Sequence, residues 1–60
     1  MMPNQAQWES LRNLVSTLAQ MNFCIRYMQV VPGGQLVVIA HHCSDRTHRK
    51  VFAISAKGDW

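Results

Sequence analysis

The chain has 60 residues, which is enough for one domain near the lower size limit at which a core can sustain a fold by itself. Apolar residues make up 48% of it and charged residues 15%, a balance that excludes an intrinsically disordered chain. The net charge of +3 is modest beside that of proteins that coat nucleic acid, but positive potential gathers over residues 41–57. That segment holds all three histidines and four of the six Lys and Arg residues: His41, His42, His48, Arg46, Arg49, Lys50 and Lys57.

The first predicted element is an amphipathic helix over about residues 5–21. Asn4 suits the N-cap position, and Gln7, three residues later, completes an approximate capping box. Apolar residues then recur at helical spacing: Trp8, Leu11, Leu14, Val15, Leu18 and Met21. Asn22 favours a left-handed stop after the helix.

Three strands are predicted after the helix, over about residues 23–31, 36–43 and 48–55. The glycines of Pro32-Gly33-Gly34-Gln35 suit a hairpin turn, residues 44–47 form a second turn, and residues 56–60 form a tail. The sequence therefore predicts a single α+β domain over residues 1–60. One N-terminal amphipathic helix packs on a three-stranded antiparallel β-meander in this domain.

A hairpin loop of two or four residues predicts the pairing of the strands. Cys24 then faces Cys43, Arg26 faces His41, and the second turn pairs His41 with Lys50. Because side chains alternate along a strand, the helix would cover Phe23, Ile25, Tyr27, Val31, Leu36, Val38, Ala40, His42, Arg49, Val51 and Ala53. The uncovered face would hold Cys24, Arg26, Met28, Val30, Val37, Ile39, His41, Cys43, His48, Lys50, Phe52 and Ile54. A slip of one residue would exchange the two faces.

An uncovered face with apolar residues is typical of an interface, so we expect a non-enzymatic binding protein. Met28 and Phe52 would be its apolar anchors, and basic residues would steer it toward an acidic partner. The predicted partner-binding residues are Arg26, Met28, Ile39, His41, Arg46, His48, Arg49, Lys50 and Phe52. Small proteins of this design are common in phages and mobile elements, which favours the regulation or inhibition of a host protein or complex. A homodimer through the same face is the alternative.

Direct nucleic-acid binding through the basic hairpin at residues 41–50 is the second hypothesis. Aromatic residues that could stack on bases are few, since only Phe52 and Trp60 are expected to be accessible.

Metal binding and catalysis are weaker hypotheses. Cys24, Cys43, His41 and His48 converge in the predicted register, but no Cys-x2-Cys knuckle is present, so we expect no metal and no cofactor. His41, Cys43 and Asp45 do not line up on one face as a nucleophile, a base and an orienting group. The predicted topology, with a strand histidine, resembles the small toxin ribonucleases of the double-stranded-RNA-binding-like fold. Those proteins carry a Gly-Ser-His element and a second helix, whereas Gln35 follows Gly33-Gly34 here and no second helix is predicted.

The sequence also predicts the cellular compartment. The N-terminus lacks the pattern of a signal peptide, and the longest apolar run, from Leu36 to Ala40, is five residues. We therefore expect no membrane association and a cytoplasmic protein with reduced thiols. A disulfide between Cys24 and Cys43 fits the predicted pairing, but a reducing compartment disfavours it.

Overall fold

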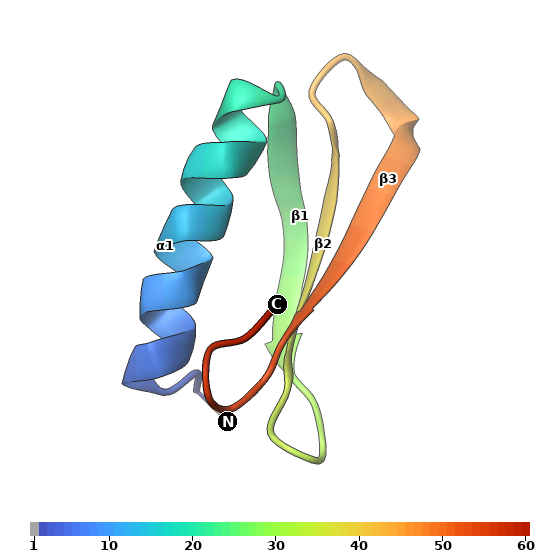
Figure 1. Cartoon of the computed structure of the whole chain (residues 1–60). Coiled ribbons are helices and arrows are strands. Elements are labelled where there is room, and N and C mark those ends of the chain that lie inside the picture. Colours follow the sequence, from blue (N-terminus) through green and yellow to red (C-terminus); the bar gives the residue numbers. More distant parts are fainter. Residues whose placement is uncertain (1) are drawn as a thin grey trace.

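The computed structural model describes residues 2–60 and contains one helix and three strands. These are α1 (Gln5–Gln20), β1 (Phe23–Val30), β2 (Leu36–His42) and β3 (Asp45–Ile54). The strands form one antiparallel sheet in the order β1-β2-β3, and α1 lies along only one side of it (Figure 1). The predicted α+β fold is confirmed.

Helix α1 begins and ends as the sequence predicts. The Asn4 side chain accepts a hydrogen bond from the Gln7 backbone N–H at 2.8 Å, and the Gln7 side chain accepts one from the Asn4 N–H at 3.0 Å. This capping box satisfies two backbone donors that the first turn would otherwise leave free. Asn22 has a φ of 62°, the left-handed conformation that ends a helix.

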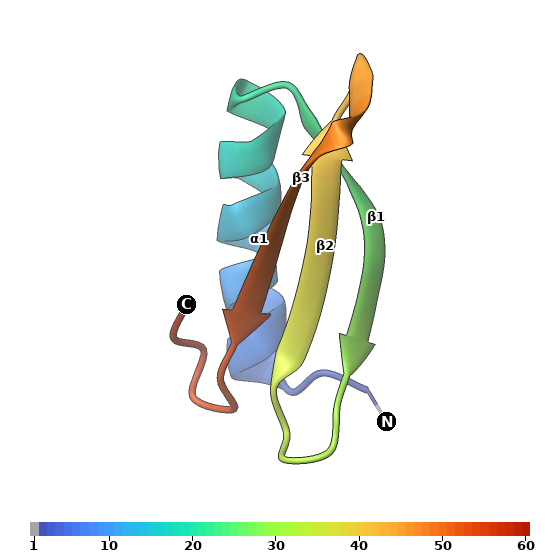
Figure 2. The same ribbon diagram turned by 90° about the vertical axis from the view of Figure 1, so that its right-hand side faces the viewer.

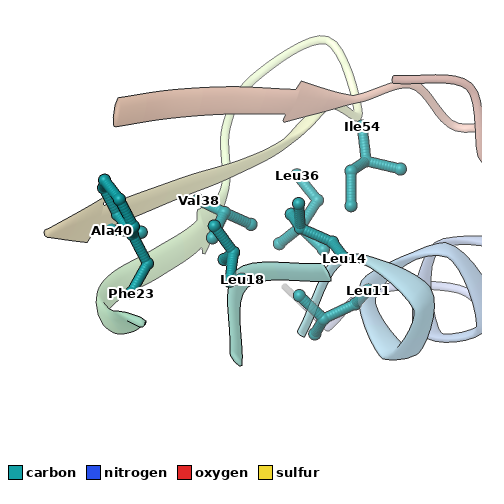
Figure 3. Close-up of a cluster of buried hydrophobic side chains, with 8 residues drawn as sticks. All are labelled: Leu11, Leu14, Leu18, Phe23, Leu36, Val38, Ala40 and Ile54. Carbon is teal, nitrogen blue, oxygen red and sulfur yellow. The ribbon is translucent and has the colours of Figure 1, made fainter. Parts of the chain in front are cut away.

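The core lies between α1 and the sheet (Figure 3). Its buried apolar residues are Leu11, Leu14, Leu18, Phe23, Leu36, Val38, Ala40 and Ile54. The Gln7 side chain is also buried and donates hydrogen bonds to the carbonyl oxygens of Gly34, at 2.7 Å, and Ile54, at 3.2 Å. Gln7 thus joins the start of α1 to the end of the sheet that carries the loop between β1 and β2, which we name the loop end. The bonds leave no polar group of its side chain unpaired.

The first hairpin has a five-residue loop, not the even-numbered loop that was predicted. Val30 pairs with Leu36, and inside the loop the Val31 N–H donates to the Gln35 carbonyl oxygen. Gly33 and Gly34 both have positive φ, at 103° and 90°, so the glycine pair makes the turn as expected. The odd loop length shifts the register, so the predicted pairings of Cys24 with Cys43 and Arg26 with His41 are wrong.

A bulge in β1 then returns the first residues of the strand, Phe23 to Ile25, to the faces that the sequence predicts for them. The register shifts between Ile25 and Tyr27, leaving Arg26 without a Cα partner on β2. The bulge lets Ile25 and Met28 share the α1 side of the sheet, although their sequence separation is odd.

The second hairpin is also more irregular than predicted. Its turn is Cys43-Ser44, because His42 pairs with Asp45, so β3 starts earlier than expected. The next pair is His41 with Arg49, which leaves residues 46–48 as an insertion on β3. The predicted pairing of His41 with Lys50 is wrong by one residue, which exchanges the two faces of β3.

These shifts alter which side chains face the helix. The prediction is right on the α1 side for Phe23, Ile25, Leu36, Val38, Ala40 and His42, and on the uncovered side for Cys24, Val37, Ile39 and His41. The residues predicted to be uncovered that the pairing places on the α1 side are Met28, Val30, Lys50, Phe52 and Ile54. The residues predicted to face the helix that lie on the uncovered side are Tyr27, Arg49, Val51 and Ala53. Placing Phe52 and Ile54 toward α1 is favourable because it adds their apolar area to a small core.

The segment after β3 folds back onto the start of α1 (Figure 2). The Asn4 side-chain amide donates to the Ala56 carbonyl oxygen at 2.8 Å, and the Ser10 hydroxyl donates to that of Gly58. Trp60 lies edge-to-face with Phe52, with 6.1 Å between ring centroids. The predicted tail is therefore a docked segment.

Candidate functional site

Three cross-strand rows make up the uncovered side of the sheet, which we name the open face. In antiparallel strands, directly paired residues project to the same side. The rows are Cys24–His41–Arg49, Tyr27–Ile39–Val51 and Gln29–Val37–Ala53.

The middle row is the apolar centre of the open face. Val51 is 66% exposed and Tyr27 48% exposed, while Ile39 between them is half-buried. The Tyr27 hydroxyl hydrogen-bonds the Gln29 side chain, so its ring runs toward the next row. Large apolar side chains grouped on one uncovered face are typical of a binding surface.

The structure divides the nine predicted partner-binding residues among different surfaces. Only Ile39, His41 and Arg49 belong to the open face. Phe52 is half-buried on the α1 side. Met28, 44% exposed, lies on the same side and belongs to the edge strand β1. The predicted apolar anchors therefore do not lie on the open face, where the exposed large apolar residues are Tyr27 and Val51.

Tyr27 was missed because an even-numbered loop was assumed between β1 and β2. Val51 was missed because the insertion at residues 46–48 was not foreseen, and that insertion shifts the β2–β3 pairing so that Phe52 and Ile54 face inward and Val51 faces outward. The signal was present in the sequence, since Phe52 and Ile54 suit a core better than Arg49 and Val51 do.

The hairpin between β2 and β3 carries three of the six Lys and Arg residues and all three histidines, and it lies at the same end of the molecule as the end of α1 (Figure 2). We name this region the cationic end, defined by Arg26, Arg46, Arg49, Lys50, His41, His42 and His48. Its charges occupy both sides of the sheet, because Arg49 pairs with His41 on the open face and Lys50 with Ala40 on the α1 side.

On the α1 side of the cationic end, three basic residues surround Phe23. The His42 and His48 rings lie edge-on to the Phe23 ring, with centroids 5.5 and 5.2 Å away, and the two imidazoles are stacked. The Lys50 Nζ lies 5.6 Å from the centroid of the same ring. This cluster covers the end of the core.

Asp45 is the acidic residue of this hairpin. Its carboxylate accepts hydrogen bonds from the Thr47 hydroxyl, at 2.6 Å, and the Thr47 backbone N–H, at 3.0 Å. These bonds, with smaller contributions from His48 and His42, hold the pKa of Asp45 below its ordinary value. The carboxylate is fully exposed, and it orders the turn rather than a catalytic histidine.

Ser44 and His42 form a hydroxyl–imidazole pair in this turn. The Ser44 hydroxyl and backbone N–H lie 2.9 and 3.2 Å from the His42 Nδ1. A nucleophile also needs a base that a third group orients, and the neighbouring Asp45 binds Thr47 instead. The pair therefore serves the turn.

A disulfide joins Cys24 and Cys43, so the expectation of reduced thiols is wrong for this structure. Their Cα atoms are 5.5 Å apart, within the range that a disulfide spans, although Cys24 pairs with His41 in the ladder. Both cysteines are exposed. The bond ties the first residues of β1 to the turn that follows β2.

The other surfaces of residues 2–60 carry fewer features of a functional site. Within residues 2–60, no group of three or more His, Cys, Asp or Glu side chains is placed to hold a metal ion. An open apolar hollow of about 270 Å³ is lined by the α1 residues Trp8, Leu11, Arg12 and Val15. Over the same described part of the chain, no helix has the length and apolar character needed to cross a membrane.

Comparison with protein-family models, with curated proteins and with solved structures found no match to this chain.

Proposed function

We propose that this protein is a small, non-enzymatic binding protein that regulates or inhibits a host protein or complex by occupying its surface. The observation that carries the proposal is the row Tyr27–Ile39–Val51, which is apolar and not covered by α1. A solitary apolar side chain on a surface means little, but a continuous row at the centre of a sheet face resembles the apolar core of an interface.

Charge favours an acidic partner. The row Cys24–His41–Arg49 adjoins the apolar centre and connects it to the cationic end. Arg26 and Arg46 extend the positive surface beyond that row. A partner with acidic residues beside an apolar patch would be steered by the cationic end and anchored by the open face.

The test compares two exposed valines on opposite sides of the molecule. Val51 lies on the open face, and Val15, 45% exposed, lies on α1. We expect Val51→Asp to weaken partner binding by at least about tenfold, because it places a charge in the apolar centre of the interface. Val15→Asp should bind as the unchanged protein does. The partner is first identified by affinity capture from host extract, and binding is then measured with purified components by calorimetry.

Two results would contradict the proposal. One is equal binding by the Val51→Asp protein when its circular dichroism shows a native fold. The other is a second copy of this chain bound to the open face. Sedimentation would then show a dimer that Val51→Asp dissociates, and no other protein would bind.

Direct nucleic-acid binding is the second candidate, favoured by the presence of cations on both sides of the sheet at one end. Arg46 and Arg49 would contact phosphates, and their contribution would be salt-dependent. Fluorescence anisotropy with labelled DNA and RNA should then show binding that falls steeply with salt. Arg46→Gln with Arg49→Gln should abolish it, whereas Arg12→Gln with Lys57→Gln, which leaves the cationic end intact, should not. Absence of binding at low salt would eliminate this candidate.

A cytoplasmic location belongs to the proposal. It is tested by alkylating thiols in acid-quenched cells that make the protein. Alkylation of Cys24 and Cys43 would support a reducing compartment, whereas a fully protected pair would contradict one.

A further inference from the structure

We infer that Cys24 and Cys43 form a redox couple that exchanges with low-molecular-weight thiols, in which His41 transfers the proton of Cys24. The inference is independent of the proposed binding function, because it rests on the disulfide and its neighbours and not on the apolar row.

Accessibility is the first requirement for exchange. Both cysteines are exposed, Cys24 on the edge strand β1 and Cys43 in the turn before β3. A thiolate must approach a disulfide sulfur directly in order to attack it, and no element of the described chain covers this end of the open face. A structural disulfide buried in a core would not meet this requirement.

His41 is the direct neighbour of Cys24 across the sheet. The two residues are direct cross-strand partners on the open face, which brings their Cβ atoms within roughly 4.5 to 5.5 Å of each other. The His41 Nδ1 lies 2.9 Å from the carbonyl oxygen of His42. A carbonyl oxygen can only accept a hydrogen bond, so Nδ1 carries the proton and the lone pair of the neutral ring is on Nε2.

Two arginines lie in the same part of the sheet as Cys24. Arg49 on β3 completes the row with His41, and Arg26 lies two residues from Cys24 on β1. The acidic group of this region, Asp45, is held by Thr47. Reactive cysteines are characteristically exposed and in positively charged surroundings, because positive charge stabilises the thiolate.

The exchange balances as two thiol–disulfide steps. A small thiolate attacks the Cys43 sulfur, the Cys24–Cys43 bond breaks, and Cys24 leaves as a thiolate that takes a proton from the protonated His41. A second small thiolate then attacks the small-molecule sulfur of the mixed disulfide and releases Cys43. Two small thiols are oxidised to one disulfide, and the protein gains two thiols and two electrons. In the reverse direction, Nε2 of His41 takes the proton from the Cys24 thiol before Cys24 attacks.

The first experiment places the purified protein in glutathione buffers of graded reduced-to-oxidised ratio and alkylates the free thiols. We expect both redox forms to be populated within the range of ratios used, and a trapped glutathione adduct to be found on Cys43. A protein that stays fully oxidised in reduced glutathione alone would overturn the inference, since the bond would then be an inert staple.

The second experiment tests His41 through the rate at which the reduced protein forms its disulfide with oxidised glutathione. We expect His41→Gln to slow this reaction by about tenfold or more. His48→Gln is the matched control, because His48 lies on the α1 side against Phe23. Equal effects of the two changes would overturn the role of His41.

A third measurement does not depend on any variant. The reduced protein should form its disulfide at least about tenfold faster in buffer than in concentrated urea. Equal rates would show that chain proximity, and not the folded surroundings of Cys24, controls the reaction.

Discussion

The two ends of the sheet are stabilised by different means. At the loop end, the row Val30–Leu36–Ile54 contributes two fully buried side chains, and Gln7 closes the end with buried hydrogen bonds. At the cationic end, the buried residues Phe23 and Ala40 lie beside basic side chains, and an exposed disulfide ties the start of β1 to the turn after β2. The loop end depends on packing. The cationic end depends on a covalent bond, which leaves its polar surface available to other molecules.

The largest loss of stability should come from a substitution that creates a cavity at the loop end. We expect Leu36→Ala to lower the free energy of unfolding by about 3 kcal/mol, because Leu36 is 1% exposed and its neighbours cannot fully close the space. The free energy of unfolding of a domain of this length is roughly 3 to 9 kcal/mol in total, so the variant should be close to unfolding at room temperature.

The measurement is urea unfolding followed by circular dichroism. Val37→Ala is the matched control, because Val37 is the next residue along β2 and is half-buried on the open face. We expect it to lose less than about 1.5 kcal/mol. A larger loss at Val37 than at Leu36 would reverse the assignment of the two faces.

The second effect tests the cationic end. Replacing both cysteines by serine removes a crosslink between residues 19 apart in sequence. A loop of this length should contribute about 3 kcal/mol or somewhat less, chiefly by restricting the unfolded chain. The amides of residues 41–49 should also exchange faster with solvent than those of residues 36–39. Uniform acceleration along β2 would show that the two ends are not stabilised separately.

The sequence was sufficient for the elements but not for their register. The capping box at Asn4, the left-handed Asn22 and the Gly33-Gly34 turn each depend on local chemistry, and all three are found. Register depends on the parity of the loop and on the bulge at Arg26, which sequence periodicity does not encode. Local signals therefore predicted the architecture, and the non-local ones decided which side chains form the open face.

The candidate site shows the same division. Ile39, His41 and Arg49 were predicted as partner-binding residues and lie on the open face, whereas Met28 and Phe52 lie on the other side. Ile39 and His41 were assigned through β2, whose alternation is unbroken. Phe52 was assigned through β3, where the insertion at residues 46–48 changes the register. Arg49 was named for its charge, not for the face on which it was placed.

A smaller effect tests the docked segment that closes the loop end. Gly58 has a φ of 91°, and a Cβ there would lie 2.9 Å from the Ser10 hydroxyl oxygen and 3.0 Å from the Ala6 carbonyl oxygen. We expect Gly58→Ala to cost about 2 kcal/mol through strain and loss of docking, seen as faster exchange of the Ser55 and Gly58 amides. Gly33→Ala is the control, since its φ is 103° but a Cβ would meet nothing within 4 Å. It should cost about 1 kcal/mol and leave those amides unchanged, and an equal effect on them would show that docking is not what Gly58 protects.

The smallest effect concerns Asp45 at the cationic end. Its pKa is lowered in the folded protein, so its stabilising contribution is present above the pKa of the unfolded chain and is lost as the pH falls through the lower folded value. Thr47→Val removes the hydroxyl that donates the 2.6 Å hydrogen bond, so the pKa of Asp45 should rise toward its ordinary value and stability should depend less on pH below about 4. Thr17→Val is the control, because the Thr17 hydroxyl donates to the Asn13 carbonyl oxygen on α1 instead. Titration of the Asp45 carboxyl by NMR measures the direction in which its pKa changes in each variant. An unchanged pKa in Thr47→Val would mean that the backbone N–H of Thr47 and the two histidines order this turn, and the hydroxyl would then have no part in separating the cationic end from the packed one.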